Sequence, residues 1–240
     1  MSRRDLILRE LGLGPVWRLR ERPAGPAEEQ TKHGVPSGLT LAESGETSDD
    51  RVAAIAAMGW DELKAAVAGC RACALCQARK QAVLGVGDVE ADWMFVGEGP
   101  GAEEDERGEP FVGQAGKLLD AMLTAIDLKR GDNVYIGNSV KCRPPGNRTP
   151  EPQETAACWP FLERQIELIK PKLIVALGRP AAQTLLQSEV KISSSRGRLF
   201  DYRGIPVVVT YHPAYLLRNL PDKARAWEDL CFMRRTMKGL

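Results

Sequence analysis

The glycine-rich segment at residues 97–116, GEGPGAEEDERGEPFVGQAG, follows an apolar run and carries side chains that could do chemistry. A glycine-rich turn after an apolar strand usually indicates a phosphate-binding loop, because its backbone amides can surround the anion. Here the segment holds six carboxylates against a single arginine, Arg107. This concentration of negative charge would repel a phosphate, so the loop is expected to hold a different kind of group.

Two other apolar runs also end in polar side chains, Asn138 in NSVKC and His212 in TYHP. An asparagine amide can both donate and accept hydrogen bonds. The second histidine, His33, lies in a polar segment near the N-terminus, which leaves His212 as the imidazole available to the folded core. With the carboxylate of Glu98 and the flat ring of Phe111, these groups predict a pocket for a neutral, flat heterocycle with hydrogen-bonding edges.

Taken singly, each of these residues also has an ordinary structural explanation. Asn138 would suit the cap of a turn, His212 the role of a hydrogen-bonded core histidine, and Phe111 the core itself. Charge runs are usually solvated, so four carboxylates are expected on an exposed loop face: Glu103, Asp105, Glu106 and Glu109. Only the convergence of the polar residues on one place favours a site.

The elements that must position these residues are short apolar strands alternating with helices from about Val52 onward. The predicted strands are ADWMFVGEG, NVYIGNSV, PKLIVALG and IPVVVTYHP, and the predicted helices lie near residues 60–70, 113–126, 149–170, 179–187 and 222–238. Such alternation predicts a three-layer α/β/α domain with a central four-stranded parallel sheet. Because ligands bind at the carboxyl ends of parallel strands, GEGPG, NSVKC and TYHP should converge on one site.

The chain has six cysteines, of which Cys70 and Cys73 form a C-x2-C pair, with Cys142 and Cys158 further along. Four thiolates can hold zinc or an iron–sulfur cluster, although the second pair lacks the tight knuckle of a zinc ribbon. Cys76 would extend the first pair, and cysteine spacing does not exclude it as a ligand. The ordinary alternative is that the cysteines are small buried apolar residues.

Composition points to a protein of the cytoplasm that does not enter membranes. No apolar run approaches the roughly 20 residues of a membrane span, and the N-terminus lacks a convincing export signal. In the reducing cytoplasm, cysteines are expected as thiols or metal ligands. The net charge of +1 is uninformative, but residues 141–148 and 191–203 each carry a local charge of +3. Residues 21–50 have the composition of a flexible linker, so the folded domain is expected at 51–240.

The motifs GEGPGAEEDERGEPFVGQAGKLLD, NSVKCRPPGNRTP and TYHPAYLLR resemble, in order, those of the family 4 uracil-DNA glycosylases, the iron–sulfur members of their superfamily. The resemblance spans roughly residues 60–235, with Gly99 where many members have alanine. It implies the glycosylase fold and a 4Fe–4S cluster that leaves Cys76 and Cys231 free. The cluster ligands that it implies are Cys70, Cys73, Cys142 and Cys158.

The resemblance also implies the reaction, which is hydrolysis of the bond between uracil and deoxyribose after the base has been flipped out of the stack. It implies that Phe111 stacks on uracil and that Asn138 reads its polar edge. His212 would hydrogen-bond the ring oxygen on which negative charge grows. The pocket beside the sugar would be lined by Glu98, Gly99 and Glu104. Glu98 is the candidate for positioning the attacking water or offsetting positive charge on the sugar.

In this reading the partner is uracil-containing DNA, bound by a monomer. The expected phosphate-binding residues are Arg143, Arg148, Arg196, Arg198 and Arg218. Leu216 or Tyr215 is expected to act as a wedge that fills the vacated stack.

Two alternatives stay open within this reading. One is a superfamily relative that acts on other deaminated bases or traps DNA covalently; the trapping relatives resemble GEQPG, whereas position 99 is glycine here. The other is a non-enzymatic iron–sulfur protein that binds DNA. That hypothesis explains the cysteines and basic loops, but it leaves Glu98, Asn138 and His212 without a purpose.

The N-terminal residues 1–20 combine leucines, arginines and Trp17, and the glycosylase motifs do not account for them. Their start is similar to that of the psi subunit of bacterial DNA polymerase III. The resemblance implies a docking peptide for the clamp loader, tethered by the linker at 21–50.

Overall fold

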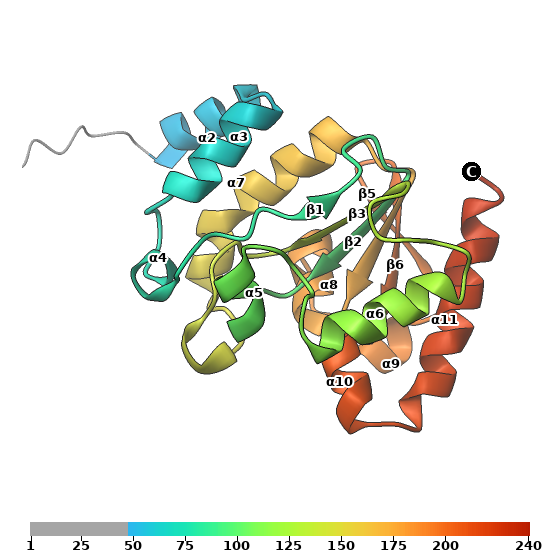
Figure 1. Ribbon diagram of the computed structural model, residues 1–240. Helices are drawn as coiled ribbons and strands as arrows, with labels where there is room; N and C mark the ends of the chain where they lie inside the picture. Colours follow the sequence, from blue (N-terminus) through green and yellow to red (C-terminus); the bar gives the residue numbers. More distant parts are fainter. Residues whose placement is uncertain (1–47) are drawn as a thin grey trace, which may run out of the picture. The chain divides into compact units, whose positions relative to one another are not determined.

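The computed structural model describes residues 48–240 (Figure 1). The candidate docking peptide at 1–20 and nearly all of the linker predicted at 21–50 lie outside the described residues. Helix α2, Ser48–Ala57, begins three residues before the predicted domain start at 51. Asp49 and Asp50 lie in its first turn, where negative charge interacts favourably with the helix dipole.

A six-stranded sheet forms the middle layer, in the order β1-β3-β2-β4-β6-β5. Its strands are β1 Val86–Gly87, β2 Trp93–Gly97, β3 Val134–Asn138, β4 Leu173–Leu177, β5 Leu199–Tyr202 and β6 Ile205–Thr210. The predicted parallel core of four strands is confirmed as β3, β2, β4 and β6. The prediction missed β1 and β5, which add antiparallel edges.

Both missed strands gave weak sequence signals for physical reasons. β1 has two residues, too few to show a period. β5 is largely exposed and pairs with β6 across a two-residue turn, Arg203 and Gly204, with φ of 51° and 86°. Two central residues with positive φ match the twist of a hairpin, and glycine adopts this conformation without strain.

Helices cover both faces of the sheet. Those on one face are α6 Gln114–Thr124, α10 Pro213–Arg218 and α11 Asp222–Met237, and those on the other are α7 Pro152–Ile169 and α8 Arg179–Leu186. The remaining helical elements are α3 Trp60–Gly69, α4 Leu75–Ala78, α5 Ala102–Arg107, the 3-10 turn η1 Pro145–Asn147 and α9 Ile192–Ser195. The three-layer α/β/α fold is therefore confirmed.

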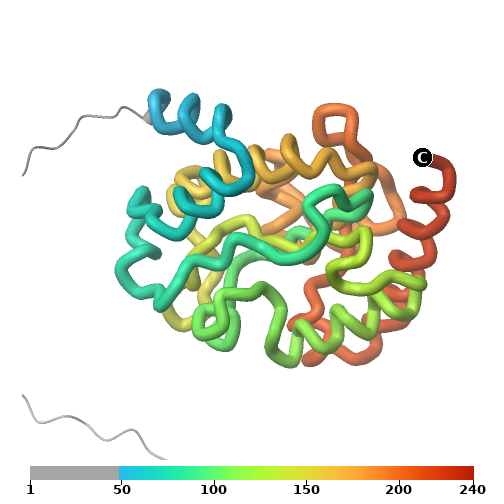
Figure 2. Tube along the Cα trace, turned by 45° about the horizontal axis from the view of Figure 1, so that its top comes forward, coloured from blue at the N-terminus to red at the C-terminus, as the bar shows by residue number. Residues whose placement is uncertain are grey.

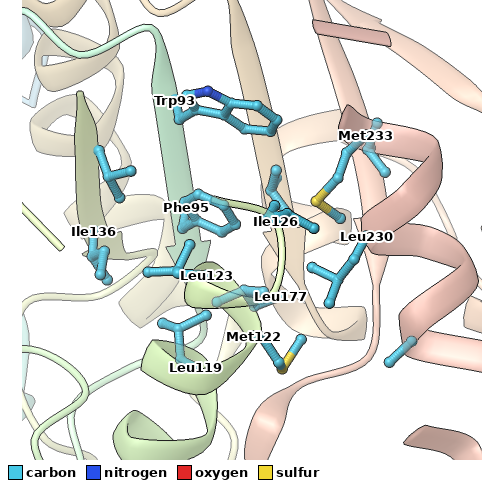
Figure 3. Close-up of a cluster of buried hydrophobic side chains, with 14 of the residues drawn as sticks. Trp93, Phe95, Leu119, Met122, Leu123, Ile126, Ile136, Leu177, Leu230 and Met233 are labelled. Atoms are coloured by element: carbon cyan, nitrogen blue, oxygen red, sulfur yellow. The ribbon is translucent and has the colours of Figure 1, made fainter. Parts of the chain in front are cut away.

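Successive strand residues supply opposite faces of the sheet, as the pleat requires. In β2, Trp93 and Phe95 pack toward α6 and α11, whereas Met94 and Val96 pack toward α7 and α8. Figure 3 shows the first of these clusters, with Phe95 close to the side chains of α6. All five residues of β2 are buried, which explains why the strand reads as one apolar run.

A third cluster joins the N-terminal helices to the end of β3. Ile55 of α2 and Leu63 of α3 pack with Phe161 of α7, and the buried Cys142 and Cys158 belong to the same cluster. Figure 2 shows the segment of α2 and α3 lying along α7. The cysteines therefore lie where two distant parts of the chain meet.

Within residues 48–240, no helix is both long and apolar enough to cross a membrane.

Candidate active site and cysteine-lined cavity

One pocket lies at the carboxyl ends of the parallel strands. The predicted residues that line it are Glu98, Gly99, Glu104, Phe111, Asn138, Arg148, His212, Tyr215 and Arg218. Gly178 and Arg179, directly after β4, also contribute to its wall. The three sequence motifs therefore meet at one place, as the topology of a parallel sheet requires.

Asn138 ends β3 and is paired in register with Gly97, the last residue of β2. Its side chain is buried, and its Oδ1 has no hydrogen-bond partner among the described residues. A Cβ at Gly97 would lie 2.4 Å from this oxygen and 2.6 Å from Cζ of Phe111, so only glycine lets the two side chains meet here. Because a buried acceptor without a donor is costly, Oδ1 is an acceptor that a ligand N–H could satisfy.

Phe111 presents its ring to this pocket from a strained backbone, with φ of 54°. The ring is buried and lies 5.5 Å from the His212 ring between centroids. Arg130 holds the loop: Nη1 donates to the carbonyl of Pro110 and Nη2 to that of Phe111, each at 2.8 Å. Sequence reasoning missed Arg130, because no local pattern connects it to a loop some twenty residues away.

Glu104 holds the same loop from the amide side. Its Oε1 accepts the backbone N–H groups of Val112 at 3.0 Å and Gly113 at 3.2 Å, and its Oε2 accepts that of Gly101 at 3.1 Å. The structure therefore gives this carboxylate a structural task beside its place in the pocket wall.

The loop face predicted to be solvated is only partly so. Glu103 and Glu106 are exposed, but Asp105 is 2% exposed and accepts the backbone N–H of Lys80 at 2.9 Å. The prediction was wrong for Asp105, because a carboxylate in α5 binds backbone amides of a preceding segment that no sequence pattern identifies.

His212 caps the N-terminus of α10. Its Nδ1 accepts the backbone N–H of Ala214 at 3.1 Å, which leaves the proton of the neutral ring on Nε2. Burial, together with the nearby charge of Arg218, lowers the pKa of His212 to about 4, and Glu104 opposes the shift. At neutral pH His212 is therefore an uncharged hydrogen-bond donor.

Glu98 stands directly after β2 and is partly buried. Burial raises the pKa of its carboxyl group, against a hydrogen bond with the Thr149 side chain and the charge of Arg179. The helix predicted near 149–170 begins at Pro152, with Glu151 as its cap, so Thr149 lies before it. Thr149 hydrogen-bonds Glu98, a role that its sequence position did not reveal.

The prediction of Leu216 as a wedge is wrong, because Leu216 is 1% exposed and belongs to the core beneath α10. Its neighbour Leu217 is 40% exposed. Tyr215 is also exposed; its ring stacks on Tyr211 at 5.3 Å and its hydroxyl donates to Asp222 at 2.7 Å.

Arg196 was expected to bind phosphate, but its charge is already used within the fold. Its side chain is only 13% exposed, with Nε 2.8 Å from buried Asp229 and Nη2 3.1 Å from Glu228. The guanidinium also lies over the Tyr211 ring, 5.3 Å from its centroid. This expectation is therefore wrong, since Arg196 fixes α9 to α11.

The other predicted arginines differ in how free their charges are. Arg148 makes two hydrogen bonds to the carboxylate of Glu154, at 2.7 and 2.8 Å, so much of its charge is compensated. Arg143 donates from Nε to the side-chain oxygen of Asn147. Because this amide is neutral, the contact does not compensate the charge of Arg143. Arg198 and Arg218 are exposed.

Five cysteines line a separate cavity between the third cluster and the end of β3: Cys70, Cys73, Cys76, Cys142 and Cys158. Arg79 donates from Nη1 to Sγ of Cys142 at 2.8 Å, and the backbone N–H of Lys141 donates to Sγ of Cys158 at 3.2 Å. Hydrogen-bond donors and a guanidinium directed at sulfur stabilise thiolates. No group of three or more Cys, His, Asp or Glu side chains within 48–240 is arranged to hold a single metal ion.

Burial raises the pKa of Cys158 to about 12 and also raises that of Cys142, with Arg79 opposing the second shift. Metal ligation would overcome this cost, because a coordinated thiol is deprotonated. Thiols from two distant segments around one cavity fit the donor set of an iron–sulfur cluster.

Comparison with known proteins agrees with this geometry. The family model of the Uracil DNA glycosylase superfamily matches residues 84–231. The chain belongs to that superfamily. It is 49% identical over 158 residues to the type-4 uracil-DNA glycosylase of Thermotoga maritima, covering 65% of this chain and 82% of that protein.

The similarity to type-4 members recurs and exceeds that to type 5. The type-4 enzyme of Archaeoglobus fulgidus is 44% identical, over 65% of this chain and 82% of its own length. A type-5 uracil-DNA glycosylase of Pyrobaculum aerophilum is 32% identical, over 55% of this chain and 66% of its length. The predicted family 4 membership of this superfamily chain is therefore confirmed.

Proposed function

We propose that this chain is a DNA repair enzyme that flips uracil out of DNA and hydrolyses its N-glycosidic bond, leaving an abasic site. The observation that carries the proposal is the unpartnered, buried Oδ1 of Asn138 beside the Phe111 ring. Uracil is a flat base whose ring N3–H can donate to this oxygen, while the amide nitrogen of Asn138 can donate to the adjacent carbonyl. Similarity to the type-4 enzymes supports the same substrate.

His212 supplies the stabilisation of the leaving group in this proposal. Cleavage of the glycosidic bond leaves negative charge on the uracil ring and its carbonyl oxygens. A neutral imidazole that donates from Nε2 lowers the energy of this anion, as donors in an oxyanion hole do. The fixed Nδ1 contact with Ala214 means that no reorganisation of the ring is needed when the charge develops.

Glu98 acts on the deoxyribose side of the glycosidic bond in this proposal. A partial positive charge grows on the deoxyribose as the base departs, and a carboxylate beside it offsets this charge or positions the attacking water. Both roles need the ionised form of Glu98; burial raises the pKa of its carboxyl group, and the Thr149 hydrogen bond and the charge of Arg179 oppose that shift.

The cysteine-lined cavity would hold a 4Fe–4S cluster through Cys70, Cys73, Cys142 and Cys158. A bound cluster supplies a cross-link between chain segments that meet in the third core cluster. Cys76 also lines the cavity and stands outside this proposed ligand set.

DNA phosphates would contact the predicted basic residues whose charges are not used internally, Arg143, Arg198 and Arg218, of which Arg218 lines the pocket. Tyr215, with the exposed Leu217 in place of Leu216, would face the gap left by the flipped base.

A gel assay on an oligonucleotide with one uracil, read after alkaline cleavage of the abasic site, tests the activity. We expect cleavage at the uracil position and none in the matched thymine oligonucleotide. Cleavage at hypoxanthine or xanthine but not at uracil would favour a relative that acts on other deaminated bases. Binding without cleavage of any of these would favour a non-enzymatic DNA-binding protein.

We expect Asn138→Asp to slow uracil excision by about 10- to 100-fold, because a carboxylate loses the donor for the uracil carbonyl and each mispaired edge costs about 1–3 kcal/mol. The variant should begin to admit cytosine, whose amino group donates to a carboxylate. Single-turnover rates on uracil and cytosine oligonucleotides measure both effects. Unchanged kinetics on uracil would remove Asn138 from base recognition.

Arg196 and Arg198 form a matched pair for DNA binding. Arg198→Ala should weaken DNA binding and reduce the slope of log affinity against log salt by about 1, as for one lost phosphate contact. Arg196→Ala should leave that slope unchanged. It should lower the free energy of unfolding by about 3–5 kcal/mol, because it leaves the buried carboxylate of Asp229 without its positively charged partner. Fluorescence anisotropy across a salt series and chemical denaturation measure the two effects. If Arg196→Ala reduced the salt slope and Arg198→Ala lowered the stability instead, the roles given to the two arginines would be wrong.

A further inference from the structure

Lys141 lies between the base-reading residue and the cysteine-lined cavity, and neither the sequence motifs nor the proposed reaction gave its side chain a task. It is one of the largest fully buried side chains, 1% exposed. Its Nζ donates to the backbone carbonyl of Asn138 at 2.7 Å and to Oε1 of Gln165 at 2.5 Å. A buried amine with two directed hydrogen bonds is held in one position.

Gln165 of α7 completes this buried network. It is fully buried, and its Nε2 donates to the carbonyl of Leu84 at 2.9 Å and to the Tyr135 hydroxyl at 2.8 Å. Each polar group in the network therefore has a partner. Of the ion pairs that the structure describes within 48–240, none joins Lys141 to a carboxylate, so its positive charge needs another counter-charge.

The cavity cysteines would supply that counter-charge as thiolates once they ligate iron. Lys141 lines the cysteine cavity, precedes Cys142, and its backbone N–H donates to Sγ of Cys158. Thiolates that ligate iron would place negative charge beside the buried ammonium, in an interior where such an interaction is weakly screened. Lys141 therefore contacts the cavity through its backbone N–H, which donates to Cys158, while its Nζ holds the strand end that carries Asn138.

We propose that Lys141 is a positioning residue for uracil recognition. With the cluster bound, Lys141 would couple the cysteine-lined cavity to Asn138 through its hydrogen bond to the backbone carbonyl of Asn138. The inference rests on the proposed function. Asn138 must place Oδ1 within hydrogen-bond reach of a base edge, and this oxygen has no partner among the described residues to hold it. Its backbone is fixed by the pairing with Gly97 on one side and by Lys141 on the other. Removing the amine loosens the residue that reads the base, although Lys141 itself does not line the base pocket.

A double-mutant cycle on the full chain tests the coupling. Lys141→Met keeps the length of the side chain without its charge or donors, and it is combined with Asn138→Ala. We expect Lys141→Met to retain iron and to lose about 10- to 100-fold in single-turnover excision, the range for residues that orient a functional group. In the Asn138→Ala background, Lys141→Met should not lower the single-turnover excision rate any further. Lys172→Met, at an exposed lysine paired with Asp92, is the matched control and should change neither readout.

Equilibrium binding gives a second readout that a merely structural role would not move. The probe is a duplex carrying a 2′-fluorinated deoxyuridine, which resists cleavage, against the same duplex with thymidine. Lys141→Met should reduce the preference for the first duplex and leave affinity for the second unchanged. Equal rate losses in both backgrounds, with iron retained and the preference intact, would overturn the proposal.

If Lys141→Met fails to fold or lacks iron, Gln165→Met takes its place in the double-mutant cycle with Asn138→Ala. Gln165→Met removes one of the two acceptors of the Lys141 amine. Its rate loss should be smaller and again absent with Asn138→Ala, and a loss that persists there overturns the proposal.

The activity of the wild-type chain separates the proposed function from the proposed role of Lys141. Failure to excise uracil refutes the proposed function, whereas an additive cycle in an active enzyme refutes only the role of Lys141.

Discussion

His212→Ala is expected to lower the single-turnover rate of uracil excision by about 10²- to 10³-fold, the loss that follows removal of one donor to a developing oxyanion. DNA affinity should change far less, because the Nε2–H bond strengthens only as negative charge builds on the departing base. Single-turnover kinetics with enzyme in excess, beside anisotropy on uncleavable duplex, separate the two quantities.

His212→Asn is the matched control for the cap of α10. Asparagine is a good N-cap, and its side-chain oxygen can accept the Ala214 N–H as Nδ1 does now. It has no atom at the Nε2 position. We therefore expect both variants to lose rate, while only the alanine variant loses the roughly 1 kcal/mol that a cap contributes. Full activity in His212→Asn would show that the cap, and not the leaving-group contact, is the function of this residue.

The pH profile distinguishes a neutral donor from a charged one. Because burial and Arg218 lower the pKa of His212 to about 4, the ring stays uncharged from pH 8 down to about 5. The excision rate should then show no step that depends on His212 near pH 6.5, the ordinary pKa of histidine. A rate that rises as pH falls through 6.5, and that loses this rise in His212→Asn, would identify the imidazolium as the active form.

The convergence of the site was predictable because it follows from topology alone. Parallel strands end at the same edge of a sheet, so recognising the strands that lead into Glu98, Asn138 and His212 placed these residues together. The buried strands were readable because both faces of the sheet are covered by helices, so β2, β3 and β4 are buried along their whole length and consist mainly of apolar residues.

The rim of the site was not predictable, because neighbouring residues of one type have opposite environments. Leu216 faces the core and Leu217 faces outward, since successive side chains of a helix point about 100° apart and α10 is too short to show a period. Arg196 and Arg198 differ because the first meets Asp229, 33 positions along the chain. Such partners depend on the packing of distant elements, which spacing does not encode.

Cys158→Ala is expected to abolish the iron content and to prevent stable folding of the region around α3 and α4. Cys158 and Cys142 are 7% and 5% exposed and lie in the core cluster that joins this region to α7. A cluster held by thiolates from both segments is a cross-link that the unfolded chain lacks, so binding it contributes directly to folding. Wild-type protein purified without oxygen should be brown, with about four irons per chain. Zinc without iron in that preparation would overturn the assignment.

The fifth thiol at the cavity makes the ligand set itself testable. Cys76 lines the cavity with the four proposed ligands, whereas Cys231 lies on α11 and does not line it. Cys231→Ala is therefore the matched control and should keep all the iron. Cys76→Ala should also keep it, and Cys70→Ala should lose it, because C-x2-C with Cys142 and Cys158 already supplies four thiolates. The reverse result, with iron lost in Cys76→Ala and kept in Cys70→Ala, would replace Cys70 by Cys76 in the ligand set. The cluster would then be held by Cys73, Cys76, Cys142 and Cys158.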